Sequence, residues 1–273
     1  MTDPGDDLAL ALRLADAADA VTSARFRAAD LHVERKPDRT PVTDADIACE
    51  DALRAVLAGE RPDDAVLGEE RGGPNADGAG DATVGRTWVV DPIDGTKNFS
   101  RGVPVWATLI ALVVDGAPAV GVISAPALGR RWWAARGRGA FTADLARGVD
   151  AAPLGVSGVA DLADAYVSTT DLGTWREEGT RERWLALVDA CWESRAFGDF
   201  FQHCLVAEGL LDLCVEPAAS AWDLAAPAVV VTEAGGRLTD LSGAARHDGG
   251  SAVSSNGRLH DAALALVGSR AAG

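Results

Sequence analysis

The sequence predicts an α+β half followed by an α/β half. Three observations predict it: helical patterns near the N-terminus, consecutive antiparallel strands within residues 106–141, and alternating strands and helices after Pro153. Polar turn residues interrupt the pattern near residues 142–155, and we therefore expect the halves to span residues 1–145 and 146–273. A chain of 273 residues is long enough to bury a sizeable core in this arrangement.

The first half is expected to begin with two helices and to continue with strands. Leu8 and Leu12 recur at helical spacing, and Thr43 with Asp46 matches a capping box that begins a second helix. A turn at Asp115 inside a long apolar stretch is typical of antiparallel strands. The predicted elements are a helix from about Asp6 to Phe26, a helix from Thr43, short strands at 65–68 and 87–90, and the antiparallel strands of 106–141.

The second half is expected to alternate between strands and helices, which is typical of a layered α/β arrangement. Each apolar strand pattern is short and is followed by a helical pattern or a turn. The predicted strands lie at 165–169, 194–198, 211–217, 237–243 and 251–256, and the predicted helices at 181–190, at 203–210, from near Trp222 and from Leu259.

The charge and the cysteines limit the expected partners and compartment. A formal net charge of −16 disfavours nucleic acid and anionic membrane surfaces, whose charges would repel the chain. A phosphate-bearing metabolite could still bind if a bound cation reversed the local field. Cys49, Cys191, Cys204 and Cys214 form no CxxC pair, so we expect reduced thiols and a cytoplasmic protein. We expect neither a signal peptide nor a transmembrane segment.

The stretch DPIDGT is the first candidate for chemistry. Pro92 fixes its own φ and keeps Asp91 extended, while Gly95 permits a sharp change of direction after Asp94. Both carboxylates could then face one locus, as a hard cation such as Mg²⁺ requires. The absence of nearby His or Cys disfavours zinc and favours magnesium or manganese. A solvated turn in which Asp91 caps Gly95 or Thr96 is the alternative.

Two further acidic clusters favour the metal hypothesis. Glu69 and Glu70 close a predicted strand, and Asp223 follows Trp222 at a predicted helix start. Each has a simpler explanation, because acids at strand ends are usually solvated and an acid in a first helical turn complements the helix dipole. Together, the clusters predict a carboxylate site assembled from separate parts of the chain.

At these motifs the chain resembles the inositol monophosphatase superfamily of Mg²⁺-dependent, lithium-sensitive phosphatases. The matching motifs are GEE at 68–70, DPIDGT at 91–96, WDLAA at 222–226 and EAGG at 233–236. Within the superfamily, RAFGDF at 195–200, RRWWAARGRGAF at 130–141 and GVPVWATLIAL at 102–112 resemble histidinol-phosphate phosphatases of the actinobacterial type. The resemblance implies a layered α-β-α-β-α sandwich, a homodimer, and hydrolysis of L-histidinol phosphate.

Other functions remain open at this point. An inositol phosphate or another sugar phosphate is the alternative substrate within the same chemistry. A non-catalytic metabolite-binding homologue would be expected to lose Glu69 or Thr96, and both are present. A structural subunit would have no use for a complete set of carboxylates.

The resemblance also implies residue roles. Roughly two or three Mg²⁺ ions, with Mn²⁺ as a substitute, would activate a water and neutralise the leaving oxygen, without a phosphoenzyme. Glu69 and Thr96 would position the water, and Asp44 would hold Thr96 or a looser third metal. The implied metal ligands are Glu69, Asp91, the Ile93 carbonyl, Asp94 and Asp223. The implied substrate contacts are Asp94, Gly95, Thr96, Lys97, Arg195, Asp199, Glu216 and Asp223.

Three expectations concern details near these residues. Asp199 and Glu216 would face the cationic half of histidinol phosphate, although Asp199 could instead cap the helix that follows it. Arg195 would orient Asp199 or reach the phosphate. Pro227 removes a backbone bond to the Asp223 carbonyl if the helix begins at Ser220, so the helix is expected to begin later or to kink. The Gly-rich loop at 72–80 matches no motif and receives no role.

Overall fold

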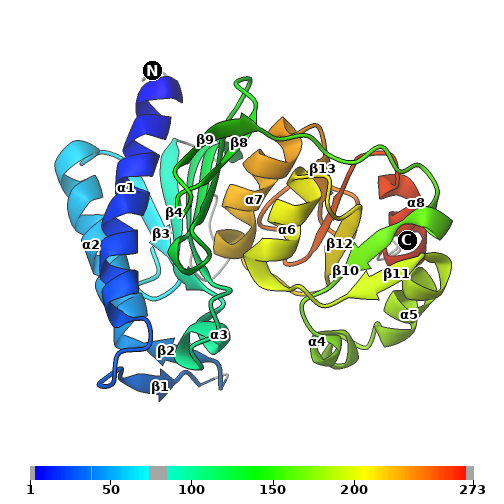
Figure 1. The fold of residues 1–273 in the computed structure, drawn as a ribbon, viewed down its shortest axis with the longest axis horizontal. Coiled ribbons are helices and arrows are strands. Elements are labelled where there is room, and N and C mark those ends of the chain that lie inside the picture. The colour runs from blue at the N-terminus through cyan, green and yellow to red at the C-terminus, as the bar shows by residue number, and fades with distance from the viewer. Residues whose placement is uncertain (1–3, 38, 74–84, 269–273) are drawn as a thin grey trace.

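Layers of helix and sheet alternate across the molecule (Figure 1). The computed structural model describes residues 4–37, 39–73 and 85–268. From one side to the other the layers are α1 with α2, a seven-stranded sheet, α6 with α7, a five-stranded sheet, and α4, α5 and α8. This is the layered α-β-α-β-α sandwich that the resemblance implied.

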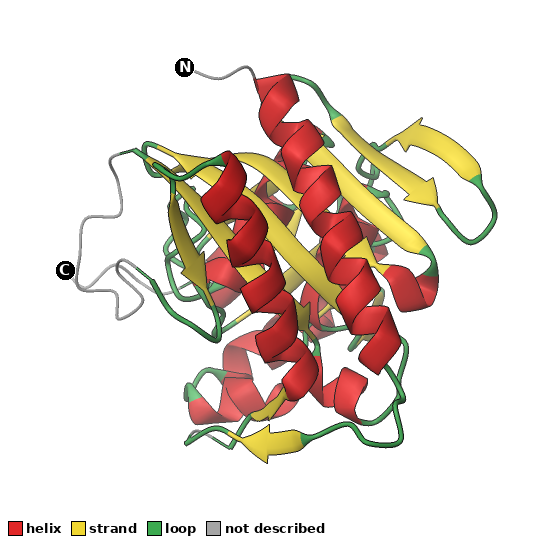
Figure 2. Ribbon diagram, turned by 90° about the vertical axis from the view of Figure 1, so that its left-hand side faces the viewer, coloured by secondary structure: helices red, strands yellow, loops and turns green. Residues whose placement is uncertain are grey.

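The outer helices of the first half match the prediction. α1 (Pro4–Arg25) and α2 (Asp44–Glu60) lie side by side across one face of the seven-stranded sheet (Figure 2). Leu10, Leu14 and Leu53 are fully buried there and pack with Trp88 of the sheet. The predicted capping box is present, and it defines the start of α2. A hairpin of β1 (Val33–Arg35) and β2 (Pro41–Thr43), which the sequence did not predict, precedes it.

The seven-stranded sheet contains the predicted antiparallel strands. Its order follows the chain from β3 to β9, and only the β3–β4 pair is parallel. The strands are β3 (Ala65–Gly68), β4 (Arg86–Asp94), β5 (Ala107–Val114), β6 (Ala117–Ala125), β7 (Arg130–Ala135), β8 (Ala140–Asp144) and β9 (Val149–Pro153), with α3 (Thr96–Ser100) after β4 and a 3-10 turn, η1 (Pro126–Leu128), before β7. The division at residue 145 stays a proposal, and β9 beyond it still belongs to this sheet.

The central helices and the second sheet form the other half. α6 (Asp199–Ala207) and α7 (Ala221–Glu233) pack against the seven-stranded sheet, so one cluster of buried side chains includes Ala111 of β5, Val206 of α6 and Val230 of α7. The five-stranded sheet has the order β11-β10-β12-β14-β13 and mixes parallel with antiparallel pairs. Its strands are β10 (Tyr166–Ser168), β11 (Glu193–Arg195), β12 (Leu213–Glu216), β13 (Arg237–Thr239) and β14 (Ala252–Ser255).

The last layer covers the far face of the second sheet. Trp175, Trp184 and Val267 pack with Val215 and Val253 of the strands. The elements here are η2 (Leu162–Asp164), α4 (Leu172–Glu177), α5 (Arg181–Ala190) and α8 (His260–Val267). No helix in the described part of the chain combines the length and the apolar character needed to span a membrane.

Of the two expectations for Pro227, the later start of α7 was wrong, whereas the kink stays a prediction. The helix begins at Ala221 and continues through Pro227 to Glu233. The Asp223 carboxylate accepts a hydrogen bond from the Ser220 amide at 2.7 Å, so the first turn has its own stabilising contact and does not depend on the backbone bond that Pro227 removes. Asp223 therefore lies in the first turn of α7, as the motif predicted.

Candidate active site

The first part of the site is a bulge at the end of β4. Asp91 pairs with Leu109 of β5 and Asp94 with Ala107, so the register shifts between the two acids. An extra residue in one strand bends it and changes which side chains share a face. Asp91 Oδ1 accepts from the Ile93 amide at 2.9 Å, and the predicted alternative, a cap on Gly95 or Thr96, is not among the hydrogen bonds of the described residues. Gly95 then turns the chain with a φ of 85°.

Asp223 brings a third carboxylate to this point from the start of α7. Asp91, Asp94 and Asp223 each offer an oxygen atom, and these atoms all lie within 4.8 Å of one another. The other contacts hold the acids in place, because Asp94 Oδ2 accepts from the Phe200 amide of α6 at 2.5 Å and Asp223 Oδ2 from Ser220. Three elements that are distant in sequence, β4, α6 and α7, therefore meet at one acidic cluster.

The electrostatics of this cluster fit a divalent cation. Burial, and then the charges of Glu69 and Asp94, raise the pKa of Asp91 well above its usual range. Burial followed by the charges of Asp199 and Asp223 does the same for the pKa of Asp94, and burial raises the pKa of Asp223 to about 7. Asp91 is buried and Asp94 and Asp223 are partly buried, and carboxylates this close together repel one another unless protons or a cation neutralise them. An all-oxygen donor set suits Mg²⁺ or Mn²⁺ rather than zinc.

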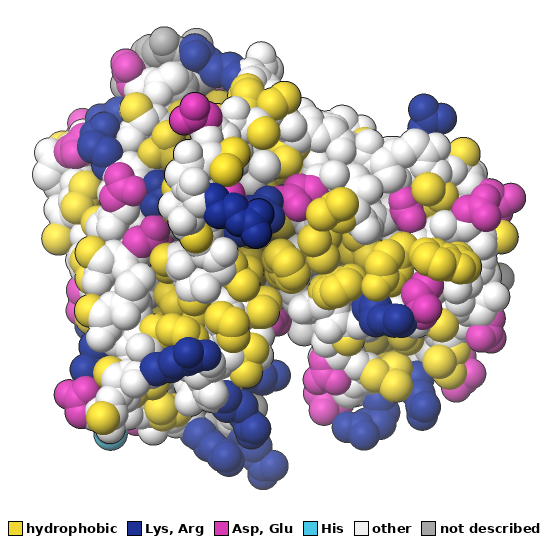
Figure 3. Space-filling model, viewed as in Figure 1, with side chains coloured by type: hydrophobic (Ala, Val, Ile, Leu, Met, Phe, Trp, Pro, Cys, Tyr) yellow, Lys and Arg dark blue, Asp and Glu magenta, His cyan; other side chains and the backbone are white. Residues whose placement is uncertain are grey.

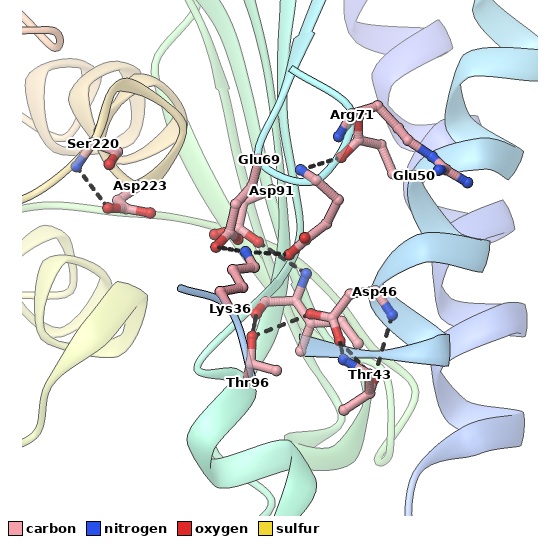
Figure 4. Close-up of polar contacts among 12 residues, drawn as sticks. Lys36, Thr43, Asp46, Glu50, Glu69, Arg71, Asp91, Thr96, Ser220 and Asp223 are labelled. Atoms are coloured by element: carbon pink, nitrogen blue, oxygen red, sulfur yellow. Dashed lines mark hydrogen bonds and ion pairs between the residues drawn. The ribbon is translucent and has the colours of Figure 1, made fainter. Parts of the chain in front are cut away.

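Glu69 lies beside Asp91 but outside the three-acid cluster (Figure 4). Lys36, in the hairpin turn between β1 and β2, donates to Glu69 Oε1 at 2.8 Å and to Glu70 Oε1 at 2.7 Å. Sequence reasoning missed this contact. One signal was available, because Lys36 and Lys97 are the only lysines among 25 basic residues; Lys36 pairs with Glu69, and the charge of Lys97 acts on Asp199.

Glu50, a fully buried residue of α2 that the sequence analysis also missed, supports the turn after β3. Its carboxylate accepts from the Glu70 amide at 2.8 Å and the Arg71 amide at 3.2 Å, and it pairs with Arg54. Only glycine fits at position 68, because a Cβ there would overlap the Glu50 carboxylate. These contacts explain physically why the GEE motif begins with Gly68.

The acid that contacts Thr96 is Asp46, so the expectation that Asp44 holds Thr96 was wrong, whereas its alternative role at a looser third metal stays a prediction. Thr96 Oγ1 lies 3.1 Å from Asp46 Oδ1 and 2.9 Å from the Ile93 carbonyl oxygen. Burial raises the pKa of Asp46 to about 6. Asp44 points elsewhere, pairs with Arg25 at 2.6 Å and leaves 40% of its side chain exposed. The reason is the capping box, which turns Asp46 back toward Thr43 and into the protein.

A cavity of about 130 Å³ adjoins the carboxylate cluster. Besides Asp94 and Asp223, its lining includes the carboxylates of Asp199 and Glu216 and the buried side chain of His203. Burial and the charge of Glu216 raise the pKa of Asp199 to about 6, whereas the charge of Lys97 opposes the rise. The cavity is therefore strongly acidic, with two carboxylates beyond those of the cluster.

Asp199 does not serve as a side-chain cap. Gly198 is the N-cap residue of α6, and no hydrogen bond of the described chain uses the Asp199 carboxylate. The backbone of Asp199 has a φ of 48°, a left-handed conformation that Asp and Asn tolerate better than most residues. Such strain is often retained at binding sites, where surrounding contacts enforce it.

The structure places Arg195 away from Asp199. It lies on the edge strand β11, where its guanidinium donates to Glu193 and to the Ser194 carbonyl and the side chain is 54% exposed. The expected contact with Asp199 is not found among the described residues, because the guanidinium pairs with its neighbours Glu193 and Ser194 instead.

Comparison with known proteins places the chain in a family with similar sequences. A model of the inositol monophosphatase family matches residues 4–271. The chain belongs to this family. A histidinol-phosphatase of Mycobacterium tuberculosis is 58% identical over 262 residues, covering 95% of this chain and 96% of that protein. A histidinol-phosphatase of Streptomyces coelicolor is 52% identical over 274 residues, covering 99% and 100%.

The solved structures include family members with the same fold. An inositol monophosphatase from Zymomonas mobilis superposes with a TM-score of 0.81 at 32% sequence identity, covering 98% of this chain and 99% of that one. The sequence similarity to the two histidinol-phosphatases is thus higher than the similarity to this inositol monophosphatase.

Proposed function

We propose that the protein is a metal-dependent phosphatase that hydrolyses L-histidinol phosphate to L-histidinol and phosphate. The similarity to histidinol-phosphatases over nearly the whole chain supports this function. The single observation that carries it is the cavity at the carboxylate cluster, which adds Asp199 and Glu216 where the organic half of a substrate would lie. A tail with an amine and an imidazole matches this acidic lining, because charge-assisted hydrogen bonds are the stronger ones.

Mg²⁺ is the proposed cofactor, with roughly two or three ions per site and Mn²⁺ as a substitute. Asp91, Asp94 and Asp223 would hold it, with Glu69 and the Ile93 carbonyl as further ligands. The mutual repulsion of the buried Asp91 and the partly buried Asp94 and Asp223 supports this assignment. When bound, the metal supplies positive charge that activates water and offsets the charge of the phosphate and of the leaving oxygen.

The other proposed roles belong to the chain itself. Glu69 and Thr96 would hold the attacking water, with Asp46 fixing the Thr96 hydroxyl. Lys36 would keep Glu69 and Glu70 in place. The substrate phosphate would contact Lys97 and the amides of Gly95 and Thr96 at the start of α3, and Asp94 and Asp223 would act on it through the bound metal. Arg195 has no role in this proposal.

The test is phosphate release from histidinol phosphate, inositol 1-phosphate and glycerol phosphate, each with Mg²⁺ and with excess chelator. Histidinol phosphate should give the highest kcat/KM, and activity should require the metal. A preference for inositol phosphate would reject the proposed substrate, and full activity in chelator would reject the metal assignment. The family resemblance also implies inhibition by lithium.

We propose a homodimer in the cytoplasm as the working state of the enzyme. The four cysteines are free thiols, which suits a reducing compartment. Apolar side chains gather in a band over α6, β10 and β11 (Figure 3). Trp192 and Leu210 are 68% and 63% exposed, and contiguous exposed apolar patches are typical of protein–protein interfaces. Sedimentation or light scattering would measure the oligomeric state directly.

A further inference from the structure

A single hydroxyl group connects the two additional acids of the cavity. Thr170 directly precedes the segment leading into α4, and its Oγ1 lies 2.7 Å from Glu216 Oε1, 3.0 Å from the Asp199 amide nitrogen and 3.2 Å from Gln202 Nε2. Both nitrogen atoms carry hydrogens and act as donors, so the hydroxyl accepts from both and directs its one proton to Glu216. The hydrogen-bonding capacity of this hydroxyl is fully used.

Gln202 supports the same arrangement from the buried side. Its side chain is fully buried, and Nε2 donates to Glu216 Oε1 at 2.5 Å. His203 Nε2 lies 3.8 Å from the same oxygen. Oε1 of Glu216 is thus committed to the protein, whereas no hydrogen bond in the described part of the chain uses Oε2. Because Glu216 lines the cavity, Oε2 is the atom left for a ligand.

The Asp199 end is held through the backbone. The Asp199 amide donates to Thr170, and the next amide, that of Phe200, donates to Asp94. These two bonds hold the left-handed first residue of α6 in place, while the Asp199 carboxylate lines the cavity without a hydrogen bond. Without the Thr170 hydroxyl, a partly buried amide would lose its acceptor and a strained residue would lose one of its two restraints.

We propose that Thr170 is a positioning residue for substrate specificity. It sets the separation between Glu216 Oε2 and the Asp199 carboxylate, so that the two acids bind a substrate tail with two nitrogen groups that can carry positive charge. This inference rests on the proposed function, because histidinol phosphate has such a tail. An ester with a neutral tail would gain little from two fixed anions, so the hydroxyl should matter for one class of substrate and not for the other.

The test compares three substitutions. Thr170→Val keeps the shape of the side chain and removes the hydroxyl. Thr170→Ala removes the hydroxyl with less crowding, and Thr170→Ser retains the hydroxyl. Val and Ala should raise the KM for histidinol phosphate about tenfold with kcat nearly unchanged, and Ser should restore the wild-type value. The affinity of the Val and Ala variants for L-histidinol, measured as a competitive inhibitor, should fall by a similar factor. Hydrolysis of glycerol phosphate should stay within about twofold in all three.

A matched control is Thr180→Val, at the start of α5. The Thr180 hydroxyl is buried and has no hydrogen-bond partner among the described residues, so the same substitution removes no contact there. This variant should match the wild type on both esters. Thermal unfolding identifies variants that do not fold. If the Thr170→Val variant does not fold, the comparison of Thr170→Ala with Thr170→Ser tests the role of the hydroxyl.

The outcomes separate this inference from the function on which it rests. A wild-type enzyme without preference for histidinol phosphate over glycerol phosphate would refute the proposed function. If the wild type shows the preference and the folded Val or Ala variant keeps it, the positioning role is wrong. Equal losses on both esters, or no recovery with Ser, would also overturn it, because a general structural role predicts those results.

Discussion

Replacing Asp199 by Asn would isolate the contribution of one negative charge to substrate choice. Asn has the same shape and tolerates the left-handed φ of 48° at this position. The backbone amide would still donate to Thr170, so the start of α6 should be unchanged. Since the Asp199 carboxylate forms no hydrogen bond within the described chain, the substitution removes charge without breaking a structural contact.

The magnitude follows from the contact that would be lost. A hydrogen bond to a charged partner contributes about 1.5–3 kcal/mol, and each 1.4 kcal/mol corresponds to about tenfold, so kcat/KM for histidinol phosphate should fall roughly ten- to a hundredfold. Relief of the repulsion between Asp199 and Glu216 should offset part of the loss and favour the lower end. Because the pKa of Asp199 is about 6, the difference from wild type should be full at pH 8 and shrink below pH 6.

The assay is the initial rate of phosphate release from histidinol phosphate and glycerol phosphate between pH 5.5 and 8, values chosen to lie roughly on both sides of that pKa. Glycerol phosphate hydrolysis should stay within about twofold of wild type. Asp161→Asn, the same change at an exposed cap of η2, serves as the control. A comparable loss on both esters, or no loss on either, would refute the reasoning that Asp199 recognises the cationic tail.

Asp94→Asn should reduce activity by more than the roughly 10- to 100-fold loss that is typical when a residue supporting a metal ligand is replaced. Circular dichroism should show an intact fold, and near-wild-type turnover would contradict the proposed metal site. Glu69→Gln should lower kcat by about a hundredfold or more with little change in KM, whereas a raised KM at constant kcat would exclude its role on water. Asp46→Asn should reduce kcat well beyond Asp44→Asn, and the reverse order would restore the original expectation for Asp44. In chelator, the thermal unfolding temperature should fall as pH rises from about 4 to above 7, because the raised pKa of Asp223 makes the folded state bind more protons than the unfolded state over that range. Mg²⁺ should raise the unfolding temperature most at the upper end of this pH range, where its carboxylate ligands are ionised. Unfolding temperatures that do not change with Mg²⁺ would argue against binding.

Local signals in the sequence predicted most of the elements correctly. The spacing of apolar residues depends only on the geometry of a helix or a strand, so α1, the antiparallel strands β5 to β8 and the alternation after Pro153 could be predicted without knowledge of the packing. The capping box of Thr43 and Asp46 is a contact between near neighbours, and it is present as predicted. The convergence of Asp91, Asp94 and Asp223 was expected from the acidic clusters together with the motif resemblance.

Short elements without a strong pattern were missed. The β1–β2 hairpin has three-residue strands, α4 has six residues, and every residue of β9 is exposed, so none of them shows a clear apolar period. Their stability comes from contacts with the rest of the protein, which the local sequence does not reveal. The missed contact of Lys36 depends on one of these elements.

The sequence by itself determined the longer elements and the family motifs, because both rest on residues close together in the chain. Only the tertiary structure decided which polar side chains meet. Asp46 rather than Asp44 reaches Thr96, Arg195 turns away from Asp199, and the Thr170 hydroxyl joins Asp199 to Glu216. The pairing of Arg195 is local. The other two outcomes depend on contacts between residues separated by 29 to 50 positions in the sequence. Packing of the layers sets such contacts, and apolar periodicity does not encode them.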